Sequence, residues 1–413
     1  MDDHEADIKT VISTLSDEAD RGESVNLMEP LLIAESSKYR TGLTDLAVEL
    51  AARSAGFRRS LPEGVLTALS HLVRSMNCYY SNLIEGHDTH PIDIERALKN
   101  DYSADSAKRN LQREAKAHIA VQQWIDEGGL RGHAATIDGI CEIHRRFGEL
   151  LPEEMLLAED PDTGELIAVT PGELRLKDVK VGQHIPVSPG AVPRFLERFE
   201  NFYGRLGKTD TILAVASAHH RLLWIHPFLD GNGRVARLMS YAMLLDTLDT
   251  GGIWSIARGL ARDVAAYKSH LAGCDLPRRN DLAGRGHLSE EALATFTRFF
   301  LETCIDQVKF MEELVQPDRL RDRILIWTEE ETRAGALPPK SGSVLEAILY
   351  RGELPRGEVP SLLGTSERHA RRVTSALIDR EVLISESLRA PLRLLFPAKL
   401  ASRWMPGLFP EKN

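Results

Sequence analysis

The sequence predicts a mainly α-helical protein made of two or three domains. Its 413 residues exceed the size of one ordinary core, because a domain takes on the order of 150 residues. Over residues 26–125 apolar side chains recur at helical spacing, as Leu66, Leu69, Leu72 and Val73 do, and few helix breakers interrupt each run. This part of the chain therefore predicts several helices that pack together.

One segment interrupts the helical pattern. Residues 151–193 are rich in proline and glycine and contain a short alternation of apolar residues at Leu174, Leu176, Val179 and Val181. Alternation of this kind is typical of a strand, while proline and glycine are typical of turns. We expect a β-hairpin or an exposed flap in this segment.

Helical spacing returns after this segment. Residues 195–206 and 211–225 keep the helical period, and the proline and two glycines of residues 226–234 (HPFLDGNGR) predict a loop. Beyond this loop the apolar residues Val235 and Leu238 continue into a further helix. The loop therefore connects two buried helices.

The C-terminal part has a different composition. Residues 332–342 have the Pro, Gly and Ser content of a linker, and residues 340–413 carry a net charge of +4 against −14 for the rest. The pattern beyond the linker is a helix, a short helix, a longer basic helix and strand-like residues. This order resembles a winged helix-turn-helix, in which residues 365–382 would be the recognition helix.

Composition and charge exclude several classes of protein. With 43% hydrophobic and 27% charged residues the chain is globular, and a net charge of −10 argues against a surface built wholly for nucleic acid or an anionic membrane. Four cysteines without a CxxC pair indicate neither a disulfide framework nor a zinc ribbon, which fits a reducing compartment. No stretch reaches about 18 apolar residues. We expect a cytoplasmic protein with no membrane partner.

Residues 226–237 (HPFLDGNGRVAR) concentrate groups that suit a phosphorylated ligand. Gly231 and Gly233 lie where a loop enters a helix, so backbone N–H groups there can approach an anion at the positive end of the helix dipole. Arg234 and Arg237 are three residues apart on the same helix, and two forked donors suggest more than one phosphate. The sequence therefore predicts a polyphosphate site.

The same twelve residues contain candidates for proton transfer and metal binding. His226 is the group whose unperturbed pKa suits proton abstraction near neutral pH. Asp230 supplies the single carboxylate by which Mg²⁺ is usually tethered when substrate phosphates provide other ligands, and Phe228 is expected to point inward as an anchor. Taken singly each residue has an ordinary structural explanation, but the combination favours a catalytic site. His219 and His220 lack a suitable metal-ligand spacing with His226, so we interpret His219 as a packed histidine.

Residues 226–237 match every position of the Fic family signature, HxFx(D/E)GNGRxxR, and the chain resembles that family over about residues 30–310. The resemblance implies a Fic-fold helical core with a small β-hairpin flap, and it implies a protein adenylyltransferase that moves AMP from ATP to a Ser, Thr or Tyr hydroxyl of a target protein. A glycine at 233, where relatives that phosphorylate their targets carry a lysine nearby, favours AMP transfer. In this family pattern His226 would be the general base and Asp230 would bind Mg²⁺. Gly231, Asn232 and Gly233 would cradle the phosphates. Arg234 would contact the β-phosphate and Arg237 the γ-phosphate.

Two further segments resemble parts of the family. The flap would pair the backbone of Val181, Gly182, Gln183 and His184 with the target as an added strand. Tyr267 is the candidate for stacking near adenine, although a pair of adjacent tyrosines is usual in relatives and Ala266 precedes it here.

An inhibitory motif also appears upstream. Residues 81–86 match the family pattern (S/T)xxxE(G/N), in which Ser81 and Glu85 are four apart and share a helix face. The resemblance implies that Glu85 pairs with Arg237 and occupies the donor needed for the γ-phosphate.

We therefore divide the chain into an acidic tail (1–25), a helical region with the inhibitory helix (26–125), a Fic catalytic core with closing helices (126–331), a linker (332–342) and a winged helix-like domain (343–413).

Two other functions stay open from the sequence. The same glutamate supports AMP removal in some relatives, so a de-AMPylase is one alternative. The second is a DNA-binding regulator with a nucleotide-sensing core, in which phosphate contacts would come from Arg368, Arg371, Arg372 and Arg380. The expected partners are thus a target protein, a second copy of the chain in a homodimer, and DNA at the C-terminal domain; ATP is the expected co-substrate and Mg²⁺ the expected cofactor.

Overall fold

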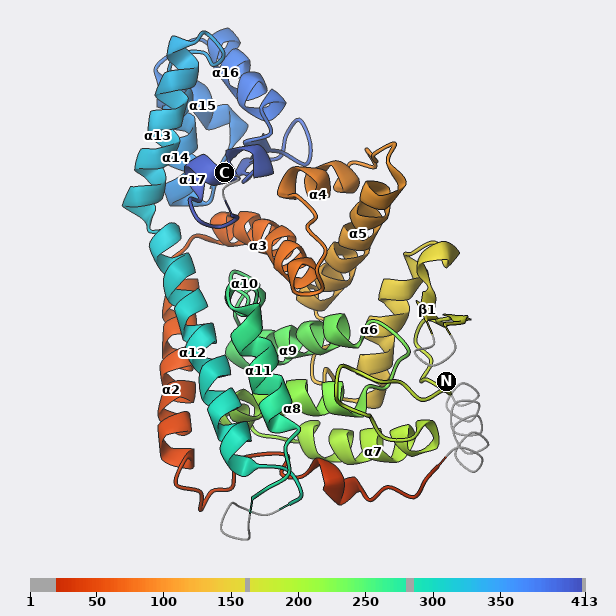
Figure 1. Cartoon of the computed structure of the whole chain (residues 1–413). Helices are drawn as coiled ribbons and strands as arrows, with labels where there is room; N and C mark the ends of the chain where they lie inside the picture. Colours follow the sequence, from red (N-terminus) through yellow and green to blue (C-terminus); the bar gives the residue numbers. More distant parts are fainter. Residues whose placement is uncertain (1–19, 160–163, 280–285, 411–413) are drawn as a thin grey trace.

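The structure is a computed structural model that describes residues 20–159, 164–279 and 286–410. The predicted mainly α-helical fold is confirmed (Figure 1). The helices up to the C-terminal module are α2 (Arg40–Arg59), α3 (Glu63–Ile84), α4 (Pro91–Leu98), α5 (Ser106–Asp126), α6 (Ile137–Glu149), α7 (Val192–Tyr203), α8 (Lys208–Ile225), α9 (Asn232–Leu248), α10 (Ala257–Arg262), α11 (Val264–Cys274), α12 (Glu290–Leu314) and α13 (Pro317–Arg333). Residues 1–19, most of the predicted acidic tail, lie outside the described residues.

Helices α8 and α9 pack side by side at the centre of the fold (Figure 1). Residues 212–222 of α8 and 235–244 of α9 are buried throughout, because both helices carry apolar residues around most of their circumference. Helices α2, α7 and α12 cover α8, while α5 and α6 pack on α9. The loop between the two central helices, residues 226–231, is therefore fixed at both ends by buried helices.

The hairpin expected within residues 151–193 is present, but it lies earlier in the segment than the alternating apolar residues that indicated strands. The antiparallel pair consists of β1 (Leu157–Glu159) and β2 (Leu166–Ala168), whereas residues 174–180 form no strand. In this segment the buried Arg175 guanidinium donates to the backbone carbonyls of Lys177 and Val187, so these two carbonyls are bound by a side chain and not by a neighbouring strand. The apolar residues of this segment that alternate in sequence are not buried on one face, and Leu176 and Val181 are exposed. We call residues 173–188 the flap.

Residues 341–410 form the C-terminal module. It contains α14 (Ser341–Arg351), β3 (Glu353–Leu354), α15 (Val359–Leu363), α16 (Glu367–Asp379), β4 (Leu383–Ile384), β5 (Leu392–Leu394) and α17 (Ala401–Trp404). The strands form an antiparallel sheet in the order β3-β5-β4. This helix and strand order is the one that a winged helix requires, and the winged-helix classification stays a prediction.

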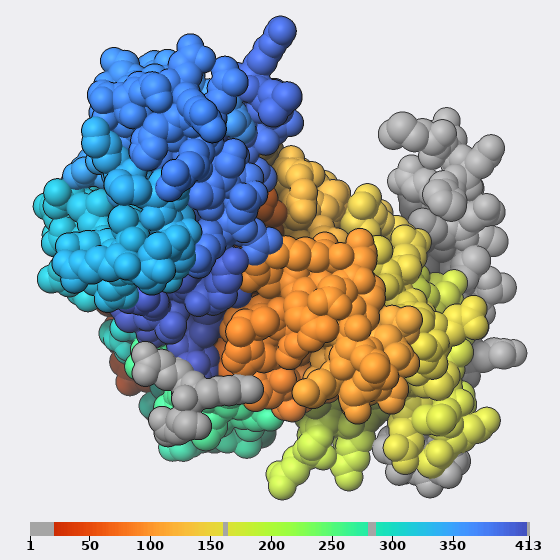
Figure 2. All heavy atoms as spheres, turned by 90° about the horizontal axis from the view of Figure 1, so that it is seen from above, coloured from red at the N-terminus to blue at the C-terminus, as the bar shows by residue number. Residues whose placement is uncertain are grey.

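The module is joined to the rest of the chain by packing as well as by sequence. Helix α13 packs against α14 and α17, and the space-filling view shows the module (blue) against the region of α4 and α5 (orange; Figure 2). Glu95 of α4 accepts a hydrogen bond from the Ala398 N–H at 3.0 Å, and Lys99 pairs with Glu381. Of the arginines expected to contact DNA, Arg371 pairs with Glu367 and Arg380 with Glu331, so DNA binding stays a prediction.

Within the described residues no helix is both long and apolar enough to cross a bilayer.

Trp404 is expected to be the main anchor of the C-terminal module. Its side chain is 1% exposed and meets Trp327 of α13 edge to face at 5.2 Å between ring centroids. Trp404→Ala should lower the free energy of unfolding by ~3–5 kcal/mol, because it leaves a large cavity. Leu388→Ala, at a site that is 89% exposed, should change it by no more than about 0.5 kcal/mol. Urea unfolding followed by tryptophan fluorescence and circular dichroism measures both, and equal midpoints would contradict this role for Trp404.

Candidate active site

The loop between α8 and α9 has two left-handed residues that shape it. Helix α8 ends at His226, which has φ 53°, and Gly231 has φ 81° directly before α9 begins at Asn232. Asn232 braces the loop, since its amide donates to the Phe228 carbonyl at 2.8 Å and accepts from the Phe228 N–H at 3.0 Å. Its side chain is therefore engaged within the protein, and any contact with phosphate falls to its backbone N–H.

Phe228 is fully buried and lies against a histidine that the sequence did not single out. The ring of His144 on α6 stacks on Phe228 at 4.0 Å with an interplanar angle of 4°. Nδ1 of His144 accepts from the Gly172 N–H at 2.8 Å, which assigns the proton to Nε2, and Nε2 donates to the Asp230 carbonyl at 3.2 Å. Burial lowers the pKa of His144 to about 4, so it is neutral at pH 7. His144 thus ties α6 and Gly172 to the loop.

His226 is a neutral imidazole in this structure. Burial, and secondly the charge of Arg175, lower the pKa of His226 to about 4. Its Nδ1 is buried and has no hydrogen-bond partner, while its backbone N–H is used by the Leu222 carbonyl. A deprotonated ring is the form that accepts a proton.

Arg237 lies in the first turns of α9 and is neutralised by the end of α3. Its NH2 group is 2.5 Å from Glu85 Oε1, its Nε donates to Ser81 Oγ at 2.8 Å, and NH2 also donates to the Ser81 carbonyl at 3.3 Å. Burial raises the pKa of Glu85, but the charge and hydrogen bond of Arg237 outweigh it, so the pKa is lowered overall. Glu85 and Arg237, which are 152 positions apart in the sequence, are thus brought together as the family pattern implied, and Ser81 binds the same guanidinium.

At Gly233, in the first turn of α9, the Glu85 carboxylate occupies the space that a side chain would need. A Cβ built there would lie 2.4 Å from Glu85 Oε1, closer than any real contact. The Glu85 carboxylate therefore lies directly against the helix N-terminus, where the dipole favours an anion. In the described structure Glu85 is thus the anion held at this end of α9.

Arg234 is also paired with a carboxylate, and the sequence did not indicate the partner. Its Nε is 3.5 Å from Glu114 Oε1 of α5, and its guanidinium lies 5.0 Å above the Phe147 ring. Glu114 Oε2 is 3.0 Å from His87 Nδ1, and this hydrogen bond raises the pKa of His87. Glu114 therefore lies between His87, the residue after the inhibitory motif, and Arg234.

Asp230 has the properties of a metal ligand that needs a substrate to complete the site. Its side chain is 56% exposed, and its described ion-pair partner, Arg234 NH2, is 3.9 Å away. Within the described residues no three His, Cys, Asp or Glu side chains converge on one point. One exposed carboxylate beside a helix N-terminus fits Mg²⁺, which usually keeps several waters and is held by one or two carboxylates, better than a metal bound by protein ligands alone. Among the other histidines, His219 is packed as predicted, between Ser240 and Tyr267.

Tyr267 is not placed for adenine stacking. It is 2% exposed, and its hydroxyl is 2.6 Å from His219 Nε2, because α11 packs this ring into the core. Burial raises the pKa of Tyr267 to about 12. The side chain thus supports the central helices and presents no open face to a nucleotide in this structure.

The flap residues form a tight turn. Val181 and His184 exchange backbone hydrogen bonds at 3.0 Å around Gly182, which has φ 61°, and Gln183 completes the turn. His184 Nε2 is 2.8 Å from the Trp224 carbonyl of α8. The turn is thus tethered beside the loop that carries His226.

This loop and its surroundings match a known protein family. The model of the Fic/DOC family matches residues 134–244, which include α6, α8, the loop and most of α9. The chain is 28% identical over 194 residues to the protein adenylyltransferase Fic of Drosophila ananassae. The aligned region covers 46% of this chain and 34% of that protein. With the protein of the same name from Drosophila persimilis it shares 29% identity over 169 residues, 40% of this chain and 30% of that protein. The match thus spans about a third of each relative's length.

One solved structure has the same fold over most of the chain. It is the crystal structure of a Fic family protein from Desulfovibrio desulfuricans G20, with a TM-score of 0.51 and 16% identity, covering 88% of this chain and 98% of that one. At this identity the likeness concerns the fold alone.

Buried neutral histidines make stability depend on pH. His118 of α5 is 0% exposed with both ring nitrogens unpartnered, and burial lowers its pKa from 6.5 to about 3. Below pH 6.5 the histidine binds a proton in the unfolded chain but not in the folded protein. The free energy of unfolding is therefore unaffected by His118 above pH 6.5 and decreases as the pH falls below it. His118→Leu should shrink the difference in unfolding free energy between about pH 8 and about pH 5 by about 2 kcal/mol.

Denaturant titrations at the two pH values measure this difference. His133→Leu, which replaces a histidine near the surface, is the control and should keep the wild-type pH dependence. An unchanged slope in His118→Leu would show that His118 is not neutral in the fold.

Proposed function

We propose that the protein is a protein adenylyltransferase, held inactive by Glu85, that transfers AMP from ATP to a Ser, Thr or Tyr hydroxyl of a target protein. The observation that carries the proposal is the ion pair of Glu85 and Arg237 at the N-terminus of α9, beside the loop of His226. This is a site for a polyphosphate in which a carboxylate holds the place of an anion. The Fic domain and the similarity to named adenylyltransferases support the same class of reaction.

The residues of the loop suit each part of the transfer. The backbone N–H groups of Gly231, Asn232 and Gly233 and the two arginines would hold the phosphates, leaving the α-phosphorus exposed to attack. Asp230 would hold Mg²⁺, which neutralises phosphate charge when bound. Oriented in this way, the nucleotide and the target hydroxyl react at an effective concentration that free solution does not reach.

His226 would act as the general base. The target oxygen forms a bond to the α-phosphorus while its proton passes to the imidazole, and the bond to the β-phosphate oxygen breaks, releasing pyrophosphate. The low pKa of His226 keeps the ring deprotonated before ATP arrives. Phosphate charge in the site raises that pKa, so a bound nucleotide makes the ring a stronger base.

Glu85 would block this reaction by competing for Arg237. With the guanidinium engaged by Glu85 and Ser81, the γ-phosphate lacks its donor, and the carboxylate repels it at the same helix end. The same carboxylate, one third exposed, favours a second function in which it orients water to remove AMP from a modified target. De-AMPylation is therefore the second outcome of the experiment below.

Glu85→Gly should raise labelling of the protein itself or of a target from [α-³²P]ATP by ~10- to 100-fold, because a charge-assisted hydrogen bond of ~1.5–3 kcal/mol is removed from Arg237. Adding His226→Ala should then reduce the rate by ~10²–10⁴. Label from [γ-³²P]ATP should stay absent, since pyrophosphate leaves. Mass spectrometry of lysate proteins identifies the modified hydroxyl.

Glu63→Gly, an exposed glutamate at the other end of α3, is the matched control and should leave labelling at the wild-type level. No increase in Glu85→Gly contradicts the proposed brake, and no α-label under any condition contradicts the transferase. Removal of AMP from a labelled target by wild type, but not by Glu85→Gly, would assign the de-AMPylase function.

A further inference from the structure

Arg175 is buried in the flap, and among the residues that the structure describes no carboxylate forms an ion pair with it. It is 2% exposed, and burial lowers its pKa to about 10. A buried guanidinium is costly unless its donors are satisfied, so the groups that satisfy it show what it holds together. In this case the acceptors are backbone carbonyls.

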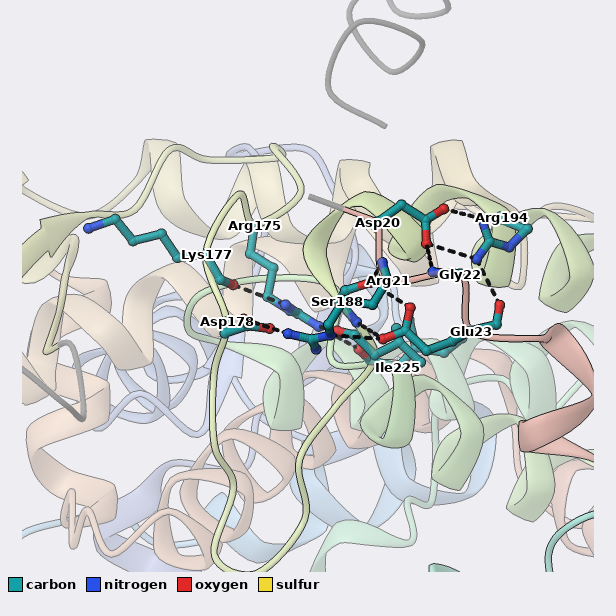
Figure 3. A network of polar contacts seen from close by, with 11 residues as sticks. Asp20, Arg21, Gly22, Glu23, Arg175, Lys177, Asp178, Ser188, Arg194 and Ile225 are labelled. Carbon is teal, nitrogen blue, oxygen red and sulfur yellow. Dashed lines mark hydrogen bonds and ion pairs between the residues drawn. The ribbon is translucent and has the colours of Figure 1, made fainter. Parts of the chain in front are cut away.

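These carbonyls belong to the catalytic loop and to both arms of the flap. Nε donates to the His226 carbonyl at 2.7 Å, and NH2 reaches the Ile225 carbonyl at 3.4 Å. NH1 donates to the Lys177 carbonyl at 2.9 Å and NH2 to that of Val187 (Figure 3). The backbone N–H of Arg175 itself donates to the Pro227 carbonyl at 2.8 Å. One side chain thus connects the end of α8 to the two ends of the flap.

Residues 20–23 hold the outer side of the same flap, as Figure 3 shows. Arg21 pairs with Asp178 at 2.8 Å, and Glu23 accepts from the N–H and the hydroxyl of Ser188 at 2.8 and 2.6 Å. Ser188 follows Val187, whose carbonyl binds Arg175. The flap is therefore fixed from the inside by Arg175 and from the outside by this N-terminal segment.

The hydrogen bonds of Arg175 support the backbone conformation of His226. Its left-handed backbone, with φ 53°, is uncommon for a residue with a side chain and needs support from its surroundings. The Arg175 hydrogen bond is made to the carbonyl of this residue. We propose that Arg175 is a positioning residue that fixes His226 and the flap relative to each other, so that the imidazole meets the hydroxyl of a flap-bound target. This inference rests on the proposed transferase function.

The test compares Arg175→Lys and Arg175→Ala in the Glu85→Gly background. Labelling from [α-³²P]ATP at saturating ATP should fall by ~10-fold in the Lys variant and more in the Ala variant, because misplacing a reacting group lowers kcat. The Kd for ATP, measured by calorimetry, should change by less than about 2-fold, since Arg175 does not touch the phosphate-binding residues. Arg198→Lys, which pairs with Glu29 away from the flap, is the matched control.

Trypsin cleavage at the exposed Lys177 and Lys180 gives a readout that needs no activity. It should accelerate in both Arg175 variants while the urea midpoint of the Lys variant stays near that of its parent. Unchanged labelling with folded protein overturns the proposal, as does a loss of ATP affinity that matches the loss of rate. A Glu85→Gly parent without activity overturns the proposed function instead, and the proteolysis result still decides whether Arg175 holds the flap.

A second, independent set of contacts connects the C-terminal module to the inhibitory helix. Directly before Ser81, the Tyr80 hydroxyl donates to the Leu408 carbonyl at 2.9 Å and the Tyr79 ring meets Phe409 edge to face at 5.7 Å. Arg258 of α10 donates to the Gly407 carbonyl at 2.9 Å. At the other end of α3, a Cβ on Gly64 would lie 2.0 Å from the Gly352 carbonyl oxygen, so helix and module are in close contact there too.

We infer that residues 407–409 act as a latch that keeps α3 in the position where Glu85 meets Arg237. This second inference also rests on the proposed function. A partner that draws the C-terminal module away would release the brake without touching the active site.

Tyr80→Phe removes one latch hydrogen bond and should raise labelling from ATP by about 5-fold. Truncation after residue 406 should raise it further, whereas Tyr350→Phe, at an exposed tyrosine of the module, should not change it. Tyr80→Phe should add nothing in the Glu85→Gly background, which separates a latch on the brake from a general loss of stability. Hydrogen exchange of the amides of residues 82–86 should accelerate in Tyr80→Phe, and unchanged exchange and labelling overturn the latch.

Discussion

The ion pair of Glu85 and Arg237 is the contact on which the arrangement of the molecule depends. Arg237 is 5% exposed in the first turns of a central helix, where an unpaired charge would be strongly destabilising. Glu85 satisfies it only while the end of α3 lies against α9, so the position of one helix is tied to the charge of another. Ser81 Oγ accepts a further hydrogen bond from Arg237, and Gly233, which has no side chain, leaves room for the Glu85 carboxylate.

The same constraint repeats around the loop with different partners. Arg234 lies 3.5 Å from a second carboxylate, Glu114, whereas Arg175 is held by backbone carbonyls. Burial, and to a lesser extent the charges of nearby arginines, lower the pKa values of His118, His144 and His226, so the three rings are neutral at pH 7. In the proposed transferase, the phosphates of ATP would take the place of the Glu85 carboxylate beside a deprotonated His226.

The sequence predicted the loop and the inhibitory motif because both are local. Gly231, Gly233 and the two arginines reveal their chemistry through spacing alone, and Ser81 and Glu85 share a face at any four-residue spacing in a helix. The sequence also predicted a hairpin within residues 151–193, but the alternation of Leu174 and Leu176 indicated strands where the chain forms none, and the observed strands lie at residues 157–159 and 166–168. Tyr267 was likewise assigned to a ligand, whereas it lies in the core.

The sequence by itself determined a mainly helical chain, the glycine-rich loop that precedes a helix, and the pairing of two distant motifs in one family pattern. Only the tertiary structure decided which buried groups support that loop. His144, Glu114 and Arg175 come from three separate segments and carry no local signal, because a lone histidine, glutamate or arginine has the same sequence appearance on a surface as in a core. Their roles come from burial, which depends on what the rest of the chain packs against them.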